Sequence, residues 1–200
     1  MGSFVIGSLT IAAAGWQFVS IGRYDLVALL LAWQYGLLMQ IPEWMQWKSM
    51  RTGTKTAVAA PLAFWLNVLQ PLAIVVSVWY ASGRPPAVAI GALVVYAALF
   101  VLDRESVAQA VRRGIAPRGS CRHLNLDDWW STPRVVLFHV VFVMAYLQLP
   151  PKLAWLNILI FEGTFLYATT FVKCGSASVW CWSVFVAGMA LWLAWRAGQI

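Results

Sequence analysis

Three ionisable side chains interrupt long apolar stretches of this sequence: Glu43, His139 and Glu162. A charged side chain at the centre of a bilayer costs at least about 2.5 to 3.5 kcal/mol on insertion scales, so such residues are expected at functional positions. Counted from the nearest basic residue at about 1.5 Å per residue, Glu43 and His139 lie about 8 Å deep and Glu162 about 16 Å deep. Carboxylates and an imidazole at these depths could bind a proton or a small cation.

Amide side chains accompany two of the apolar stretches. Gln40 and Glu43 are three residues apart, so they share one face of a helix, and Asn67 and Gln70 do the same. Each pair adjoins a proline, which removes a backbone hydrogen bond and kinks a helix. The pattern therefore places polar side chains beside kinks in two neighbouring segments.

Pro42 cannot donate to the carbonyl of Leu38, and Pro71 cannot donate to that of Asn67. Freed carbonyls at membrane depth are tolerated where they face protein or a water-filled cavity, and broken helices of this kind form transporter sites. We therefore predict a polar intramembrane cavity that opens to the cytoplasm. Its predicted substrate- or ion-binding residues are Gln40, Glu43, Asn67, Gln70, His139 and Glu162.

Each of these residues also has a structural interpretation. Intramembrane amides often link helices by hydrogen bonds worth about 0.6 to 2 kcal/mol. Glu43 could simply reach the membrane interface, and His139 could be an interior histidine with its hydrogen bonds satisfied. Glu162 is the hardest to explain in this way, because it lies near the middle of a predicted span.

The composition defines the elements that must position these residues. Of 200 residues, 62% are hydrophobic and 10% are charged, whereas a soluble domain has about 45–50% and about 25%. This excludes a soluble globular enzyme, a disordered chain, a coiled coil and a nucleic-acid-binding module. The net charge of +7 resides in short loops between apolar runs, so no nucleic-acid partner is predicted. The sequence predicts an all-α, polytopic integral membrane protein, with residues 1–200 forming a single transmembrane helical domain.

A helix needs about 20 residues to cross the hydrocarbon core, and seven apolar segments approach that length. The predicted transmembrane helices are Phe4–Gly22, Leu26–Gln46, Ala57–Ser82, Ala87–Leu102, Arg134–Leu149, Leu153–Val172 and Val179–Ala197. A basic cytoplasmic loop is predicted at about residues 103–133. Its first part, Asp103–Arg113, is expected to extend the fourth span as a polar helix.

Basic residues set the orientation, because they concentrate on the cytoplasmic side. Ten lysines and arginines fall on one predicted side and four on the other. Seven spans then place the N-terminus in the cytoplasm and the C-terminus outside. Tryptophans near the predicted span ends are typical of an aromatic belt at the membrane interface.

Several chemistries lack the residues that they need. The chain has two histidines, His123 and His139, too few for a haem bundle, a di-iron centre or a three-histidine zinc site. No nucleophile motif or phosphate-binding loop is present. The sequence therefore assigns no catalytic residue and no metal ligand, and it identifies no cofactor.

Four short motifs, spread over most of the chain, are similar to those of a known family. They are Met39-Gln40-Ile41-Pro42-Glu43, Asn67 with Gln70-Pro71, Gly119 with His123-Leu124, and Val179-Trp180-Cys181-Trp182. This pattern resembles an uncharacterised family of seven-helix membrane proteins from giant viruses and bacteria. The resemblance implies a topology and a choice of polar residues, and it implies no activity.

Three functions remain open. The favoured one is a carrier or channel for a small ion, proton or polar solute, which would use the predicted cavity. The alternatives are a structural or accessory subunit of a larger membrane complex, and an intramembrane enzyme acting on a lipid or isoprenoid, with Glu162 and His139 as acid and base. Membrane lipids are expected partners, and both a homo-oligomer and a larger membrane complex remain open.

Overall fold

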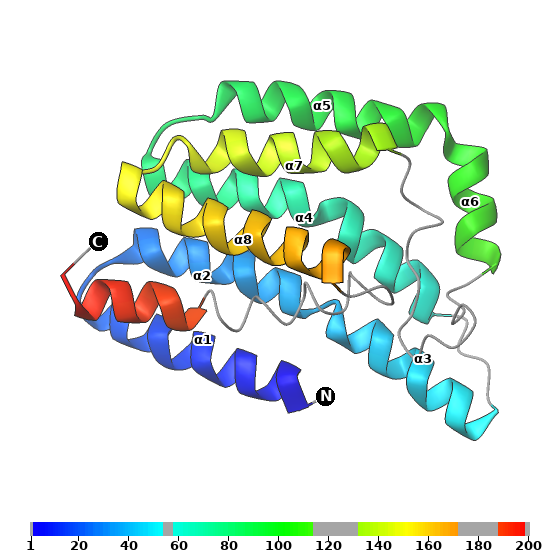
Figure 1. Cartoon of the computed structure of the whole chain (residues 1–200), viewed down its shortest axis with the longest axis horizontal. Helices are drawn as coiled ribbons and strands as arrows, with labels where there is room; N and C mark the ends of the chain where they lie inside the picture. The colour runs from blue at the N-terminus through cyan, green and yellow to red at the C-terminus, as the bar shows by residue number, and fades with distance from the viewer. Residues whose placement is uncertain (1, 54–57, 114–131, 172–187, 199–200) are drawn as a thin grey trace.

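The computed structural model is all-α over the part of the chain that it describes, which comprises residues 2–53, 58–113, 132–171 and 188–198. The helices alternate in direction and lie side by side, with the N-terminus and C-terminus at opposite ends of the bundle (Figure 1). The helices are α1 Gly2–Ser20, α2 Tyr24–Leu37, α3 Gln40–Thr52, α4 Ala59–Ser82, α5 Ala87–Leu102, α6 Arg104–Arg113, α7 Thr132–Tyr146 and α8 Pro151–Phe171. Residues 188–196 form a further helix.

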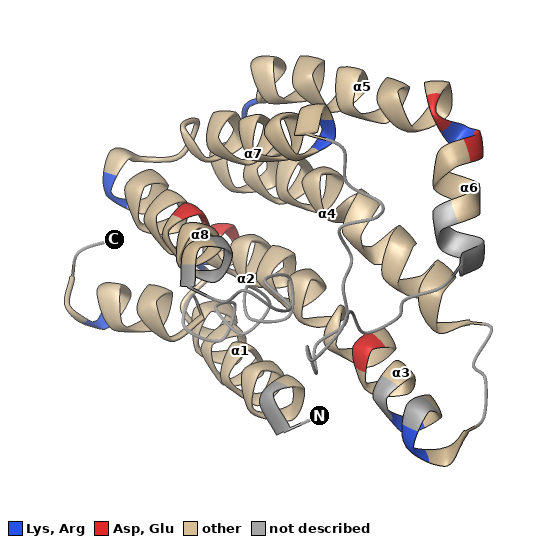
Figure 2. Ribbon diagram, turned by 45° about the vertical axis from the view of Figure 1, so that its right-hand side comes forward, with Lys and Arg blue, Asp and Glu red and all other residues tan. Residues whose placement is uncertain are grey.

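Two helical stretches, Tyr24–Gln46 and Ala59–Ser82, are long and apolar enough to cross a bilayer. Three shorter apolar helices cover Phe4–Ser20, Ala87–Leu102 and Thr132–Tyr146. The all-α prediction is therefore confirmed for the described residues, while the number of seven spans stays a prediction. Figure 2 shows that acidic and basic segments lie mainly near the helix ends and in α3 and α6.

The predicted second span consists of two helices, α2 and α3, which meet at Leu38 and Met39. The amides of Leu38, Met39 and Ile41 each bond to the carbonyl three residues earlier, at 3.0–3.3 Å. This tighter 3₁₀-type bonding follows from Pro42, which cannot supply the usual bond to the carbonyl of Leu38. The predicted kink is thus present, and α3 leaves the line of α2 (Figure 1).

The connection between α4 and α5 forms where the sequence predicts a turn. Gly83 ends α4 with φ +67°, a left-handed conformation that glycine adopts without steric cost. Pro86 then directly precedes α5, which begins at Ala87. The predicted fourth span coincides with α5, but the polar helix after it does not continue its direction. α6 instead turns across the end of the bundle (Figure 1).

The core is aromatic and aliphatic, and it lies between α1, α2, α4, α5, α7, α8 and the helix at 188–196. Phe18, Tyr96, Phe138, Phe142 and Tyr146 are each at most 3% exposed. Large apolar side chains also cover the outside of the bundle. Among the most exposed are Leu9, Trp16, Leu31, Val94 and Leu159. A bundle that is apolar both inside and outside is typical of helices surrounded by lipid.

Candidate functional site

His139 and Glu162 form an ionisable pair between α7 and α8. The Nδ1 atom of His139 lies 3.0 Å from one carboxylate oxygen of Glu162 and 2.9 Å from the other. The two side chains are 16% and 32% exposed. Sequence reasoning selected both residues as ionisable groups within spans, and the structure shows that they are in contact.

Aromatic rings surround the imidazole of His139. The ring centroid of Phe165 lies 4.1 Å from it, and those of Phe138 and Phe161 lie 5.6 and 5.8 Å away. Such an apolar environment strengthens the electrostatic contact between imidazole and carboxylate. It also disfavours an isolated charge on either side chain.

The pair can take up a single proton without separating. With neutral His139 and ionised Glu162, the imidazole N–H can donate to the carboxylate and the pair carries one negative charge. Adding one proton gives either a neutral hydrogen-bonded pair or an ion pair, and both have zero net charge. The geometry therefore suits reversible binding of one proton, or of a small cation in its place.

A second polar contact lies within the core, between α2 and α8. The indole Nε1 of Trp33 donates to the side-chain oxygen of Asn157 at 3.0 Å. The amide nitrogen of Asn157 donates to the carbonyl of Leu153 at 2.8 Å. Trp33 also stacks on Tyr146, with ring centroids 6.4 Å apart and an interplanar angle of 14°. Sequence reasoning did not select Trp33 or Asn157, although an asparagine within an apolar span was a usable signal.

The predicted amides are buried near the two prolines. Gln40, Asn67 and Gln70 are each 5–6% exposed. The side-chain nitrogen of Asn67 donates to the carbonyl of Ala63 at 3.2 Å, within α4. Pro71 lies inside α4 without ending it, whereas the Pro42 break lies beside Gln40. The amides therefore lie beside both prolines, as the sequence predicts, and a break in the helix is present at Pro42.

The structure does not bring the two candidate carboxylates into contact. Glu43 is half-buried on α3, and α3 packs against α4. Glu162 lies on α8, which packs against α7, and both views place α3 away from α8 (Figures 1 and 2). His139 and Glu162 are in contact, and a single cavity that unites all six predicted residues stays a prediction.

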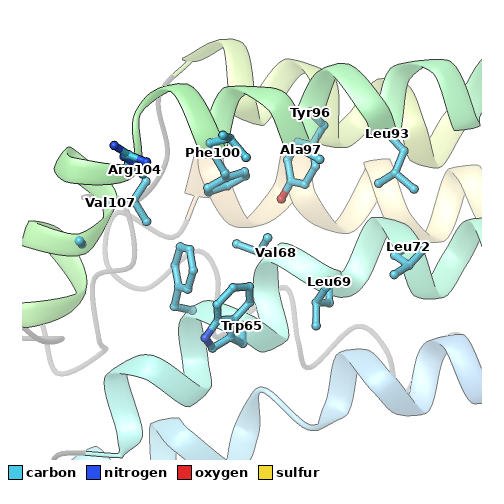
Figure 3. Close-up of a pocket in the computed structure, with 13 residues that line it drawn as sticks. Trp65, Val68, Leu69, Leu72, Leu93, Tyr96, Ala97, Phe100, Arg104 and Val107 are labelled. Atoms are coloured by element: carbon cyan, nitrogen blue, oxygen red, sulfur yellow. The ribbon is translucent and has the colours of Figure 1, made fainter.

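A separate cavity of about 800 Å³ lies between α4, α5 and α6. Its lining contains none of the six predicted residues (Figure 3). The lining is almost entirely apolar, with Trp65 and Leu69 on α4 and Tyr96 and Phe100 on α5. Sequence reasoning missed this cavity, because its apolar lining residues resemble those of any transmembrane helix.

Arg134 is another residue whose role the sequence did not reveal. Its side chain is 5% exposed and pairs with the carboxylate of Asp103, which is 49% exposed. The guanidinium also lies 4.7 Å from the ring centroid of Phe100. The pair connects the start of α7 to the end of α5, and the cation–π contact supports the same connection.

Some predicted features fall outside the described residues. These are most of the basic loop, with Gly119, His123 and Leu124, the motif at 179–182, and the first part of the predicted seventh span. Within the described ranges, no group of three or more histidine, cysteine, aspartate or glutamate side chains could hold a metal ion. Comparison with family models, with curated proteins and with solved structures finds no match for this chain. The resemblance stated above therefore stays a prediction.

Proposed function

We propose that this chain is an integral membrane protein that crosses the bilayer seven times, with its N-terminus in the cytoplasm and its C-terminus outside. The two long apolar stretches and the exposed apolar side chains support this proposal. So does the alternation of helix direction, because it gathers the end of α5, α6 and the start of α7 at one end of the bundle (Figure 1). That end contains the basic residues Arg104 and Arg134.

Within this bundle, we propose a carrier or channel for a proton or small cation, in which His139 and Glu162 form the binding site. The observation that carries this proposal is the contact of 2.9–3.0 Å between the imidazole and the carboxylate. Intramembrane ionisable residues that face one another often belong to ion pathways and proton relays. Gln40, Asn67 and Gln70 would offer neutral polar groups along the cytoplasmic half of the pathway.

In the proposed cycle, the pair accepts one proton from one side of the membrane and releases it to the other. In this cycle the phenylalanines around His139 would keep water away from the imidazole, so the proton would move only when the pair gains access to a hydrated route. The exposed fraction of Glu162, 32%, is twice that of His139. Glu162 is therefore the more accessible group of the pair, and we propose that the proton enters or leaves through it.

The test is proton flux into vesicles reconstituted with the full chain and loaded with a pH-sensitive dye, driven by an imposed membrane potential. We expect flux above that of protein-free vesicles. Glu162→Gln should abolish it, because glutamine keeps the size of glutamate but cannot bind a proton. His139→Asn should reduce it. Glu105→Gln is the matched control, because it removes an exposed carboxylate on α6 and should leave flux unchanged.

Two results would count against the proposed carrier. One is wild-type protein that gives no more flux than empty vesicles. The other is a Glu162→Gln variant that transports as well as the wild type. Both need protein that is folded, which a single, unchanged elution volume in detergent and an unchanged helical circular dichroism spectrum would establish.

A structural or accessory subunit of a larger membrane complex is the second candidate function. The large exposed rings favour it, since Trp16 is 79% exposed and Trp65 and Trp155 are each 57% exposed. Aromatic side chains are enriched where proteins contact one another. A stoichiometric partner that copurifies with the chain, and that is lost on Trp16→Ala, would support this function. A monodisperse chain that transports protons alone would contradict it.

A further inference from the structure

The cavity between α4, α5 and α6 has the shape of a groove with two different ends. Figure 3 shows Leu72 and Leu93 at one end and Arg104 and Val107 at the other. Between them, α4 and α5 contribute apolar side chains, and their polar groups are the hydroxyl of Tyr96 and the indole N–H of Trp65. A cavity of about 800 Å³ falls within the usual size range of ligand sites.

The groove is open to the outside of the bundle along its length. The lining residues Trp65, Leu72 and Val101 are 57%, 43% and 68% exposed. The lining on α5 extends from Leu93 to Val101, which is eight residues or about 12 Å at 1.5 Å per residue, and Arg104 follows at the start of α6. One leaflet of the hydrocarbon core is about 15 Å thick, half of the whole. The apolar part of the groove is thus long enough to hold most of the length of one acyl chain in one leaflet.

Arg104 is the one charged residue in the lining. It forms no ion pair with a carboxylate in the part of the chain that the structure describes, because the neighbouring Asp103 is engaged by Arg134. Glu105 is exposed and does not line the groove. The apolar length of the groove therefore ends at a guanidinium that is available to an anion.

The position of Arg104 matches the headgroup level of a bilayer. It begins α6, directly after the last residues of the apolar helix α5. α6 turns across the end of the bundle and buries Val107 against it, as an amphipathic helix at a membrane interface would. The proposed topology puts this end in the cytoplasm, where the leaflet is rich in anionic lipids.

We propose that this groove binds one anionic phospholipid of the cytoplasmic leaflet, with an acyl chain between α4 and α5 and its phosphate at Arg104. Arginine suits this role because its planar guanidinium can donate two hydrogen bonds to one phosphate. The inference rests on the chain crossing the membrane, and it does not depend on proton transport by His139 and Glu162.

Native mass spectrometry of the full chain in detergent tests the proposal, with phosphatidylglycerol and phosphatidylcholine of identical acyl chains as probes. We expect the wild type to bind phosphatidylglycerol about tenfold more tightly, a ratio that corresponds to about 1.4 kcal/mol. Arg104→Gln should bring this ratio close to one. Arg84→Gln is the matched control, because Arg84 is exposed in the turn before α5, at the opposite end of that helix, and its loss should leave the ratio unchanged.

A second pair of variants tests the groove itself. Ala97 is exposed and lines it, so Ala97→Trp should fill the groove without disturbing the core. We expect that variant to bind both lipids at least about tenfold more weakly. Each methylene group of the acyl chain that is kept out of the groove is no longer buried, and this burial energy is lost. Val94→Trp places the same ring on an exposed position of α5 outside the lining, and binding should be unchanged.

Three results would overturn the proposal. The first is a lipid preference that survives Arg104→Gln, or that Arg84→Gln removes equally, since the net charge of the chain would then explain it. The second is lipid binding that Ala97→Trp leaves unchanged. The third is a dimer free of bound lipid that Ala97→Trp dissociates, which would identify a second copy of the chain as the occupant.

Discussion

The hydrogen bond between Trp33 and Asn157 allows a quantitative test of how the core is held together. It spans 124 residues of sequence and joins α2 to α8, and both residues are at most 3% exposed. Asn157→Leu keeps the number and branching of the side-chain heavy atoms, although leucine is bulkier, and it removes the acceptor. The indole N–H of Trp33 then becomes a buried donor without its partner.

The expected cost follows from two quantities. A buried donor or acceptor that loses its partner costs about 1–3 kcal/mol, whereas hydrogen bonds between transmembrane helices average about 0.6 kcal/mol and reach about 1.7 kcal/mol. The bond of Asn157 to the carbonyl of Leu153 is also lost, but that carbonyl is within the helix and keeps other bonding options. We therefore expect Asn157→Leu to lower the free energy of unfolding by about 1–2 kcal/mol.

A double-mutant cycle with Trp33→Phe separates the hydrogen bond from the packing. Trp33→Phe alone should cost more than Asn157→Leu, because it also removes ring area that contacts Tyr146 and Phe161. The double variant should be less destabilised than the sum of the single variants, by about 0.6–1.7 kcal/mol. The assay is unfolding by sodium dodecyl sulfate in mixed micelles, followed by circular dichroism. Strict additivity, or an Asn157→Leu variant as stable as the wild type, would refute this reasoning.

Two further substitutions probe packing and charge elsewhere in the bundle. A β-carbon at Gly7 would lie 2.8 Å from a methyl carbon of Leu37, which is 1% exposed, so Gly7→Ala should destabilise the α1–α2 contact by about 1–2 kcal/mol in the same unfolding assay. Asp103→Asn removes the charge that pairs with buried Arg134, so it should lower the unfolding free energy by about 1–3 kcal/mol and flatten its dependence on salt.

Matched controls exist for both substitutions. Gly15 lies on α1 as Gly7 does, but a β-carbon there would meet its nearest neighbour at 3.9 Å, an ordinary contact. Gly15→Ala should leave stability unchanged or raise it slightly. Glu105→Gln removes an exposed carboxylate two residues from Asp103 and should change stability little. Equal effects within either matched pair would mean that the contact is not the cause.

Local chemistry made much of the fold predictable. The apolar run from Ala87 to Leu102 is bounded by a glycine–proline turn and by Asp103, and α5 has these same bounds. Gly83 and Pro86 act through their own backbone preferences, which need no information from other helices. The break before Pro42 was predictable for the same reason, because a missing N–H acts on the carbonyl four residues earlier.

Contacts between helices were not predictable in this way. The length and composition of the apolar segments showed that His139 and Glu162 lie within predicted transmembrane helices. Their contact, however, depends on how α7 and α8 are rotated about their axes. Arg134 was counted only as a basic residue at a span end, and its burial beside Asp103 depends on where α5 and α7 cross. An almost uniformly apolar helix gives little indication of which face meets its neighbour, so partner choice is absent from the sequence pattern.

The two prolines show how packing decides the result of one local defect. Pro71 is buried in α4, which packs against α2, α5 and α7, so its neighbours hold the helix on several sides and it continues to Ser82. Pro42 is also fully buried, but it lies in the first turn of α3, a more polar helix that has its main contacts with α4. With fewer contacts to oppose it, the missing hydrogen bond ends α2 and redirects the chain. Pro42→Ala would restore the missing backbone N–H donor. We infer that the packing of α3 against α4 would then determine the direction of α3.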